Sequence, residues 1–391
     1  MPHLNHDLNA DLRTLESEGL LRAPRIASAA GPRIVVDGHE CLNLASNDYL
    51  GLTQHPEVVA AAQDAAARYG TGAGASRLIC GTLPVHQELE HALARLKRTE
   101  AAIVFSSGYA ANLGTVQALV GRGDLVICDR LNHASLVDAC RLSGATLKVY
   151  RHADPDRLEA VLNRAASPRR TLIVTDGVFS MDGDLAPLPG ILDLANRCGA
   201  TVLLDDAHGT GCVGATGRGT VEHYGADPSR LIHMGTASKA LGSLGGFICG
   251  SATLIRYLHN RARSFIYSTA LAPPCAAAAL AGLRLIERDT SRLARLRDNV
   301  AALRRGLGAA GLQPVSRDSQ ITAVVIGATD RAVAFSEALF RRGVFTPAIR
   351  PPTVPAGTSR LRITVTAAHT ADDVQVASQA LVEAVGEVLQ A

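Results

Sequence analysis

Short apolar runs alternate with helical patterns between about residues 100 and 250 of this 391-residue chain. Seven of these runs are apolar on both faces and bounded by Gly, Asp or Ser, as is typical of buried strands in a parallel sheet. We expect strands at 101–105, 125–129, 146–150, 171–176, 201–205, 231–235 and 246–250. Helical patterns near 110–120, 135–142, 155–164 and 188–198 lie between most of them. Repeated βα units predict an open, mostly parallel α/β sheet.

The pattern changes on both sides of this sheet region. A long helical region is expected at 273–311, followed by strands at 321–326 and 360–365 and helices at 331–342 and 372–389. A probable first helix covers 8–21. We therefore predict an N-terminal arm (1–45), a large α/β domain (46–285) and a smaller α+β C-terminal domain (286–391).

Polar residues that could do chemistry follow the predicted strands, where ligands of such sheets bind. Small residues from Ser106 to Asn112 open a helix, so backbone N–H groups there could hold a phosphate, although a tight strand-to-helix turn explains them equally well. Asn132 is a plausible N-cap, with His133 in the first helical turn. Taken alone, His133 is more simply a capping or surface histidine.

The residues that follow two further predicted strands indicate a catalytic site more strongly. Asp205 ends an apolar strand, and His208 follows three residues later, a spacing that suits an electrophilic site or simply a helix cap with a surface histidine. Lys239 lies among small residues after another apolar strand, beside the hydroxyls of Thr236 and Ser238. A lysine that is withdrawn from water has a lowered pKa and attacks carbonyl groups more readily.

The combination is more specific than its parts. An enzyme that uses pyridoxal 5'-phosphate (PLP) needs a lysine for a Schiff base, a carboxylate for the pyridine nitrogen, a phosphate cradle and a flat group facing the ring. Lys239, Asp205, the 106–109 turn with Thr236 and Ser238, and His133 supply these in turn. The sequence therefore predicts a PLP site and no metal site. A non-catalytic PLP-binding scaffold would have no use for the proton-transfer residues.

At this point the sequence resembles the α-oxoamine synthases, PLP-dependent enzymes of fold type I, the aspartate aminotransferase fold. The resemblance covers nearly the whole chain, from NLASNDYLGL at 43–52 through TASKALG at 236–242 to RPPTVPAGTSRLR at 350–362. It implies a large, mostly parallel sheet domain with a smaller α+β C-terminal domain. It also implies condensation of an amino acid with an acyl thioester and loss of CO2.

The resemblance assigns roles to individual residues. Lys239 would bear the cofactor and then act as the base, Asp205 would pair with the pyridinium, and His133 would stack on the ring. The remaining cofactor contacts would come from Gly108, Tyr109, Ser180, His208, Thr236, Ser238 and, from a second subunit, Thr269. The substrate contacts would come from Arg22, Asn47, Ser76, Thr353 and Arg362. Arg362 would bind the amino-acid carboxylate, and Arg22, with Arg25 as a rival, the far end of the acyl chain. The Thr269 role implies a homodimer with a shared active site.

Two segments favour one member of the family. SGYAAN at 107–112 has glycine where glycine C-acetyltransferases usually have cysteine, and AIRPPT at 348–353 points the same way. The implied substrates are L-alanine and a pimeloyl thioester, on CoA or on acyl carrier protein. Glycine C-acetyltransferase and 5-aminolevulinate synthase activities remain the alternatives.

The composition and charge of the chain limit the kinds of partner that we expect it to bind. The formal net charge is +3, from 39 basic and 36 acidic residues, and no basic run predicts a nucleic-acid partner. The N-terminus lacks the pattern of a signal peptide, and no run of about 18 apolar residues predicts a membrane span. The eight cysteines show no CxxC spacing and are expected to be buried thiols. We expect a cytoplasmic protein.

Overall fold

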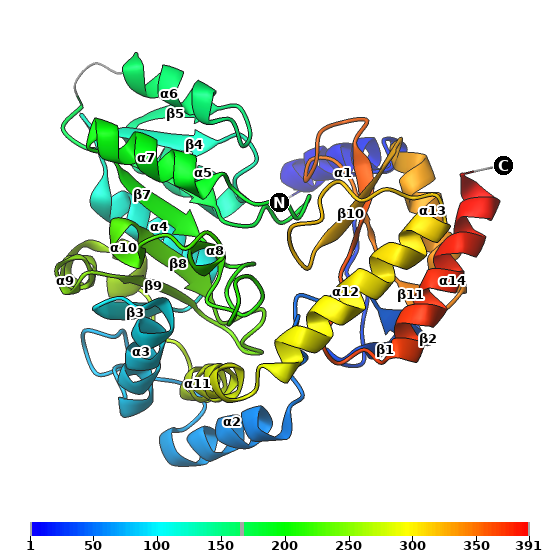
Figure 1. The fold of residues 1–391 in the computed structure, drawn as a ribbon, viewed down its shortest axis with the longest axis horizontal. Coiled ribbons are helices and arrows are strands. Elements are labelled where there is room, and N and C mark those ends of the chain that lie inside the picture. Colours follow the sequence, from blue (N-terminus) through cyan, green and yellow to red (C-terminus); the bar gives the residue numbers. More distant parts are fainter. Residues whose placement is uncertain (1, 165–167, 390–391) are drawn as a thin grey trace. The chain divides into compact units, whose positions relative to one another are not determined.

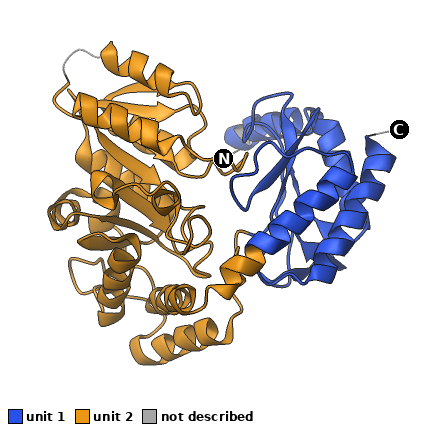
Figure 2. Cartoon of the chain, in the orientation of Figure 1, with its two compact units in different colours: residues 1–46, 297–391 blue, residues 47–296 orange. Residues whose placement is uncertain are grey.

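The computed structural model describes residues 2–164 and 168–389 (Figure 1). It contains two compact units, one formed by residues 47–296 and the other by residues 1–46 together with 297–391 (Figure 2). The N-terminal arm and the C-terminal segment thus belong to one unit. The predicted boundaries at residues 45 and 285 remain a prediction.

A seven-stranded sheet forms the centre of the 47–296 unit, in the order β3-β9-β8-β7-β6-β4-β5. Its strands are β3 (Ala101–Phe105), β4 (Leu125–Asp129), β5 (Thr146–Tyr150), β6 (Thr171–Asp176), β7 (Thr201–Asp205), β8 (Ile232–Thr236) and β9 (Gly246–Gly250). All run in the same direction except β9, which is antiparallel to both β3 and β8. The prediction of a mostly parallel α/β sheet is confirmed.

Two helix layers cover this sheet because alternate residues of each buried strand face opposite sides. On one side, Val126 and Cys128 of β4 belong to a core with α4 (Gly108–Leu119), α5 (Ala134–Leu142), α9 (Ala252–Arg261) and α10 (Arg263–Ile266). On the other side, Leu125 and Ile127 of the same strand pack with α6 (Pro155–Asn163), α7 (Leu188–Cys198) and α8 (Thr220–His223). The unit also contains α2 (Pro56–Tyr69), α3 (Pro84–Lys97), α11 (Pro273–Arg288) and a 3-10 turn, Pro228–Arg230.

The other unit contains two small sheets. One has the order β10-β13-β12, from Thr322–Gly327, Ser359–Ile363 and Ala348–Ile349, and is antiparallel. The second has the order β1-β2-β11, from Arg33–Val36, His39–Asn43 and Val344–Phe345. The remaining helices are α1 (Pro2–Ser17), α12 (Ser291–Ala309, which spans the boundary at 296), α13 (Thr329–Arg341) and α14 (Ala371–Val388). The predicted α+β character of the C-terminal region is confirmed.

The structure corrects several local predictions. The first helix ends at Ser17 and not at residue 21, because Gly19 adopts a left-handed conformation (φ 66°) and the Leu20 N–H turns back to the Leu15 carbonyl. The strand β5 is mostly exposed because it lies at the edge of the sheet. The helical region at 273–311 is two helices, α11 and α12.

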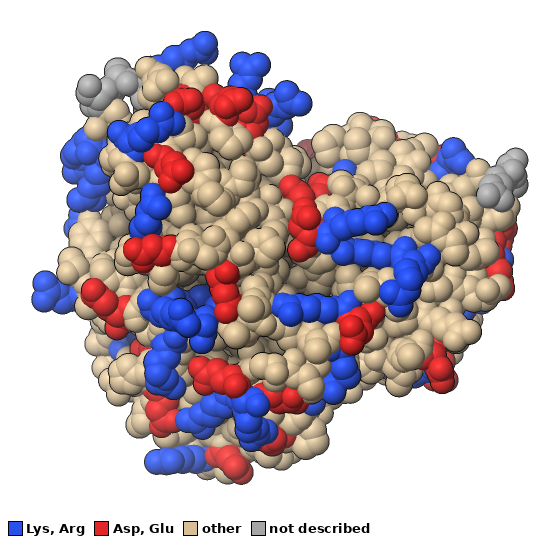
Figure 3. Space-filling view, viewed as in Figure 1, with Lys and Arg blue, Asp and Glu red and all other residues tan. Residues whose placement is uncertain are grey.

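Side chains of both charge signs are interspersed over the face drawn in Figure 3. Within residues 2–164 and 168–389, no helix is both long enough and apolar enough to cross a bilayer. The eight cysteines form no disulfide, and Cys80 and Cys198 are exposed, which contradicts the expectation that all are buried.

Candidate active site

Asp205 lies at the carboxyl edge of the sheet, and hydrogen bonds hold both of its side-chain oxygens. It ends β7 and is 4% exposed. Its Oδ2 accepts a hydrogen bond from Asn112 Nδ2 (2.7 Å), and its Oδ1 accepts one from the Ala207 N–H (3.0 Å). Asn112 lies on α4 and also donates to Ser135 Oγ (2.9 Å). Two N–H donors therefore hold the buried carboxyl group of Asp205 in one orientation.

His133 comes to the same edge of the sheet from the connection between β4 and α5. It is the N-cap residue of α5, and its Nδ1 accepts from the Ser135 N–H (3.3 Å), so Asn132 is not the cap as predicted. Asn132 instead donates to the Val174 carbonyl (2.9 Å), which ties this turn to β6. Burial lowers the pKa of His133; the charge of Asp205 opposes this and that of Lys239 adds to it. A neutral ring with Nδ1 as acceptor holds its proton on Nε2.

Asp176 is a further carboxyl group of the site. It ends β6, where it is the registered neighbour of Asp205 on β7, and it accepts a hydrogen bond from the His133 N–H (2.9 Å). Burial, and then the charge of Asp205, raise the pKa of Asp176 well above its usual value, whereas the His133 N–H and Lys239 oppose the rise. Asp176 therefore holds a proton more readily than an ordinary aspartate.

Lys239 lies in the turn after β8. Its side chain is half-buried, and its charge acts on the pKa of both His133 and Asp176, which places it within electrostatic range of the carboxyl edge. The Thr236 hydroxyl shapes this turn, since it accepts from the Ser238 N–H (3.1 Å) and donates to the Gly245 carbonyl (2.6 Å). Ser238 Oγ lies 3.0 Å from Thr236 Oγ1.

The N-terminus of α4 lies where the phosphate cradle is predicted. Ser107 is its N-cap, with Oγ accepting from the Ala110 N–H (3.1 Å). Gly108 and Tyr109 are the first two helical residues, so their N–H groups have no carbonyl within the helix to bond. A Cβ at Gly108 would lie 3.7 Å from the Thr236 side chain, so this N-terminus adjoins the Lys239 turn. The Tyr109 ring points elsewhere, since its hydroxyl donates to Asp138.

A hydrogen-bonded chain orients His208. Its Nδ1 lies 2.7 Å from the hydroxyl of Tyr49, which is fully buried, and that hydroxyl lies 3.1 Å from Asn47 Oδ1. Two predicted site residues, Asn47 and His208, are therefore joined through Tyr49. His208 itself is 6% exposed and not the surface histidine of the alternative interpretation.

Ser180 lies in a short hairpin closed by the Val178–Leu185 bridge. His152 holds this hairpin to the sheet: its Nδ1 is 2.9 Å from Asp129 Oδ1 at the end of β4, and its Nε2 is 2.8 Å from Asp184 Oδ2. Burial lowers the pKa of His152, but the two carboxylates outweigh it and raise the pKa to about 10. His152 is therefore charged at neutral pH.

Ser76 and Thr269 are brought together as a β-bridge within the 47–296 unit. Large apolar side chains near them are exposed: Leu78 (52%), Ile79 (79%) and Tyr267 (73%). Apolar side chains gathered on a surface often mark an interface. The roles predicted for Ser76 and Thr269 remain predictions.

The predicted substrate residues of the other unit lie in two places. Arg22 donates to the carbonyls of Arg350 (3.3 Å) and Pro351 (2.9 Å), and the Thr353 N–H donates to the same Arg350 carbonyl (3.2 Å). The rival Arg25 is paired with Asp37 (2.7 Å) and lies over the Phe340 ring (4.3 Å). The Arg25 guanidinium therefore already binds partners within the same unit.

Arg362 lies on β13, opposite Ala323 of β10, and is 8% exposed. Its side chain is therefore buried and not part of an exposed strand surface. A buried guanidinium needs an anionic or polar partner, and a carboxylate matches its planar donors.

The groups at the carboxyl edge fit PLP. They comprise a lysine, a buried carboxylate held by N–H donors, a histidine with its proton on Nε2 and a helix N-terminus with unbonded N–H groups. The Asn112 Oδ1 atom is buried without a hydrogen-bond partner, as happens at sites that bind polar ligands.

Sequence reasoning missed three members of this site. Asp176 shares with Asp205 the position at the end of an apolar strand, and this signal was available. Asn112 and Tyr49 lie inside the quoted segments, but their partners, Asp205 and His208, are 93 and 159 residues away. Such pairings depend on tertiary structure and have no local pattern.

Comparisons with known proteins identify the family to which the chain belongs. The model of the family Aminotransferase class I and II matches residues 39–381. An 8-amino-7-oxononanoate synthase of Geobacter metallireducens is 50% identical over 380 residues, covering 96% of this chain and 97% of that protein. A protein of the same name from Cellvibrio japonicus is 46% identical over 389 residues, covering 99% and 96%.

Two solved enzyme structures share the fold of this chain over most of its length. A serine palmitoyltransferase variant of S. paucimobilis with a bound PLP–myriocin aldimine has a TM-score of 0.93 and 33% identity, covering 98% of each chain. An 8-amino-7-oxononanoate synthase of Francisella tularensis has a TM-score of 0.76 and 27% identity, covering 89% of this chain and 98% of that one. The chain belongs to the class I and II aminotransferase family of PLP-dependent fold type I enzymes and, within it, to the group of 8-amino-7-oxononanoate synthases.

Proposed function

We propose that this chain condenses L-alanine with a pimeloyl thioester to give 8-amino-7-oxononanoate, CO2 and the free thiol, the step of biotin biosynthesis for which its relatives are named. The observation that supports it most is identity of 46–50% over nearly the full chain to proteins of that name. The gathering of Lys239, Asp205 and His133 at one sheet edge supports the same chemistry.

Bound PLP supplies an electron sink for negative charge on the α-carbon of the amino acid. Lys239 would hold the cofactor and, when free, would take the α-proton of alanine on Nζ. Asp205 would hold a proton at the pyridine nitrogen, for which its two N–H donors orient it. His208, fixed through Nδ1 by Tyr49, would bind the phenolic oxygen together with Ser180. Gly108, Tyr109, Thr236 and Ser238 would bind the phosphate.

The new carbon–carbon bond of the product replaces the carbon–sulfur bond of the thioester. The α-carbon of alanine forms a bond with the thioester carbonyl carbon, the carbon–sulfur bond breaks and the thiol leaves. His133 Nε2 donates to the oxygen of that carbonyl group, a role for which its neutral form with Nδ1 as acceptor is suited. The carboxylate of alanine leaves as CO2, and a proton returns to the α-carbon.

Two arginines divide the two carboxylates of the substrates. Arg362 binds that of alanine and Arg22 the distal one of the pimeloyl chain, with Asn47, Ser76 and Thr353 as further contacts. The ion pair of Arg25 with Asp37 favours Arg22 over Arg25 for this task. The active enzyme is a cytoplasmic homodimer in which Thr269 reaches the phosphate of the partner's site.

Related α-oxoamine activities are the competing assignment. Glycine C-acetyltransferase and 5-aminolevulinate synthase differ in both substrates, and the fold similarity to a serine palmitoyltransferase adds serine as an amino acid to test. Identity of 33% to that protein, against 50% to a named 8-amino-7-oxononanoate synthase, favours alanine.

One experiment tests the proposal. The purified protein is assayed with alanine, glycine and serine against pimeloyl-CoA and pimeloyl-acyl carrier protein, and CO2 and thiol release are measured. We expect release with alanine and one or both pimeloyl carriers, and borohydride reduction should fix PLP to a peptide that contains Lys239. Preference for glycine or serine over alanine, no release with either pimeloyl carrier, or an adduct on another lysine would overturn it.

A further inference from the structure

Asp206 follows Asp205 directly, yet its side chain has a separate and fully buried set of partners. Its Oδ2 accepts from Lys97 Nζ (2.8 Å), and its Oδ1 accepts from the Thr220 hydroxyl (2.6 Å). The Thr220 N–H lies 3.2 Å from both oxygens. The side chains of Asp206 and Lys97 are 0% and 1% exposed. The carboxylate is therefore completely withdrawn from water and depends on these donors.

Hydrogen bonds of its backbone also hold Asp206 in place. Its N–H donates to the Met234 carbonyl of β8 (2.9 Å). Its carbonyl accepts from the N–H groups of Gly209 (3.1 Å) and Thr210 (2.8 Å) and from the Thr210 hydroxyl (2.8 Å). The turn that contains Asp205 and His208 is thus built around Asp206.

Glycines leave room for this carboxylate. A Cβ at Gly209 would lie 1.9 Å from Asp206 Oδ1, and one at Gly219 would lie 1.7 Å from Asp206 Oδ2. Any side chain at either position would displace the carboxylate. The space around Asp206 is therefore shaped for an anion held by Lys97 and Thr220.

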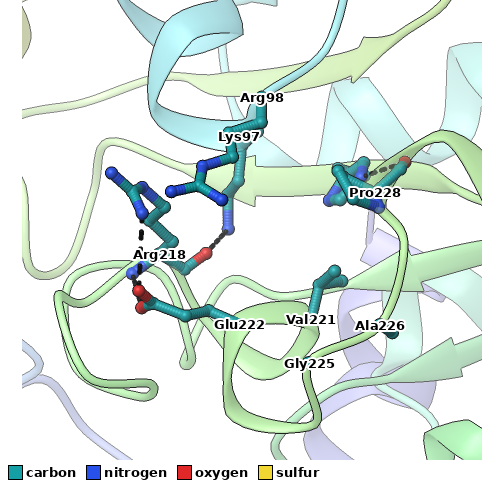
Figure 4. A pocket seen from close by; sticks show the side chains of 9 residues that line it. Lys97, Arg98, Arg218, Val221, Glu222, Gly225, Ala226 and Pro228 are labelled. Carbon is teal, nitrogen blue, oxygen red and sulfur yellow. Dashed lines mark hydrogen bonds and ion pairs between the residues drawn. The ribbon is translucent and has the colours of Figure 1, made fainter.

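Lys97 reaches this place from the last residue of α3, a helix outside the βα units that make the catalytic edge. Besides Asp206, its Nζ donates to the Arg218 carbonyl (2.7 Å). Figure 4 shows this bond at a pocket of about 210 Å³ that is lined by Lys97, Arg98, Arg218 and Glu222, among others. The Arg218 guanidinium turns to Glu222 (3.5 Å), so only its carbonyl bonds Lys97.

We propose that Lys97, Asp206 and Thr220 form a buried positioning cluster that fixes the 205–208 turn and thereby aims Asp205 and His208 at the PLP ring. This rests on the proposed function of those two residues. The cluster touches neither substrate nor cofactor and acts through the turn. Misplacing a catalytic group by about 1 Å can cost roughly 100-fold in rate.

The physical reason lies in the buried charge. Removing one partner of a buried ion pair leaves the other charge without compensation, and the structure around it rearranges or the group takes a proton. The Thr220 hydroxyl and N–H alone would then hold Asp206. The turn would sample other conformations, and the adjacent Asp205 would lose its fixed aim.

The test compares four variants of the holoenzyme. Lys97→Met and Thr220→Val remove donors to Asp206, Thr220→Ser keeps the hydroxyl, and Arg218→Met removes a cation from the same pocket while leaving the carbonyl that Lys97 uses. Three quantities are measured: amide hydrogen exchange in residues 205–210, the dissociation constant of PLP, and kcat and KM for alanine.

We expect faster exchange in 205–210, weaker PLP binding and a kcat lowered roughly 10- to 100-fold with KM for alanine little changed in Lys97→Met and Thr220→Val. Thr220→Ser and Arg218→Met should behave as wild type. If Lys97→Met does not fold, the Thr220 pair decides. Wild-type exchange and PLP binding in Thr220→Val, or equal losses in Arg218→Met, would overturn the positioning cluster. A wild-type protein that binds no PLP would instead refute the proposed function, and the exchange rates would still decide the cluster.

Discussion

Asp176 and Asp205 are registered neighbours on β6 and β7, but their surroundings differ. Asp205 accepts from Asn112 Nδ2 and the Ala207 N–H, which fix the orientation of its carboxyl group. Burial and the charge of Asp205 raise the pKa of Asp176 well above its usual value. Asp176 therefore holds a proton more readily than an ordinary aspartate, and Asp205, with its orientation fixed, is the candidate partner of a ring nitrogen.

Replacing Asp205 by asparagine tests this assignment. An amide cannot hold a proton at the pyridine nitrogen, so the electron sink is lost while the shape is kept. We expect Asp205→Asn to retain some PLP but to lose at least about 100-fold in turnover, as for other positioned proton-transfer groups. Exchange of the alanine α-proton, followed by NMR, measures the step directly. The control Asp193→Asn, at an exposed pair with Arg230, should exchange normally. Normal exchange in Asp205→Asn would remove it from the mechanism.

The strands of the large sheet were predictable from the short apolar runs of the sequence and the turn residues that bound them. Six predicted strands agree residue for residue with β3, β4, β5, β6, β7 and β9, and β8 begins and ends one residue later than predicted. The antiparallel direction of β9 also had a signal, because only nine residues separate it from β8 and a parallel crossover needs a dozen or more. The two-residue strands β11 and β12 had none, since neighbouring strands and not local pattern define them.

Sequence reasoning found some residues of the candidate site and missed others. Residues that follow the buried strands, such as His133, Asp205 and Lys239, were found because sheet topology places strand ends together. Lys97 and Asp206 were not, because a buried ion pair between residues 109 positions apart leaves no periodic pattern. The N-cap was assigned one residue early, to Asn132, because either side chain can accept at that position and tertiary contacts with β6 decided it.

His152 joins three elements, and its charge gives the fold a pH dependence. Its folded pKa of about 10 lies above the ordinary value of 6.5, so the stabilisation is fully present below about pH 6.5 and is lost as pH rises through about 10. Linkage sets an upper bound of about 5 kcal/mol. We expect His152→Gln to melt at a lower temperature than wild type at pH 7, with the gap closing near pH 10.5. The exposed His91→Gln is the control, and a pH-independent gap would contradict the charged clamp.

The N-terminal arm gives a second prediction at this scale, through two nearby arginines. A lost charge-assisted hydrogen bond costs roughly 1.5–3 kcal/mol, or about 10- to 150-fold in affinity. Arg22→Ala should raise KM for the pimeloyl thioester by that factor but leave a monocarboxylic donor of equal length unaffected. Arg25→Ala should lower the melting temperature without discriminating between donors, because Arg25 is held by Asp37 and Phe340. Equal impairment of both donors by Arg22→Ala would mean that the arm only supports the 350–353 segment that Arg22 bonds.

At the scale of the whole molecule, a single chain leaves apolar surface uncovered. Leu78, Ile79 and Tyr267 are exposed close to the Ser76–Thr269 bridge. A second copy that covers them would bring its own Thr269 to this region by two-fold symmetry. This supports the proposed homodimer but does not derive from any contact within one chain, which is why sequence reasoning reached it only through resemblance.

Complementation between inactive variants tests the shared site. If Thr269 serves the partner's site and Lys239 its own, a mixed dimer of Lys239→Ala and Thr269→Trp protomers has one site with both defects and one with neither. Random reassortment should then restore up to about a quarter of the wild-type activity, although each variant alone is inactive. Sedimentation velocity confirms that all species are dimers. The double variant Lys239→Ala/Thr269→Trp mixed with wild type is the control, since every mixed dimer then keeps one defect in each site. The control should therefore retain only the activity of its wild-type dimers, about a quarter of the wild-type value. Activity of about half the wild-type value in the control, with none in the test pair, would mean that Thr269 acts within its own subunit.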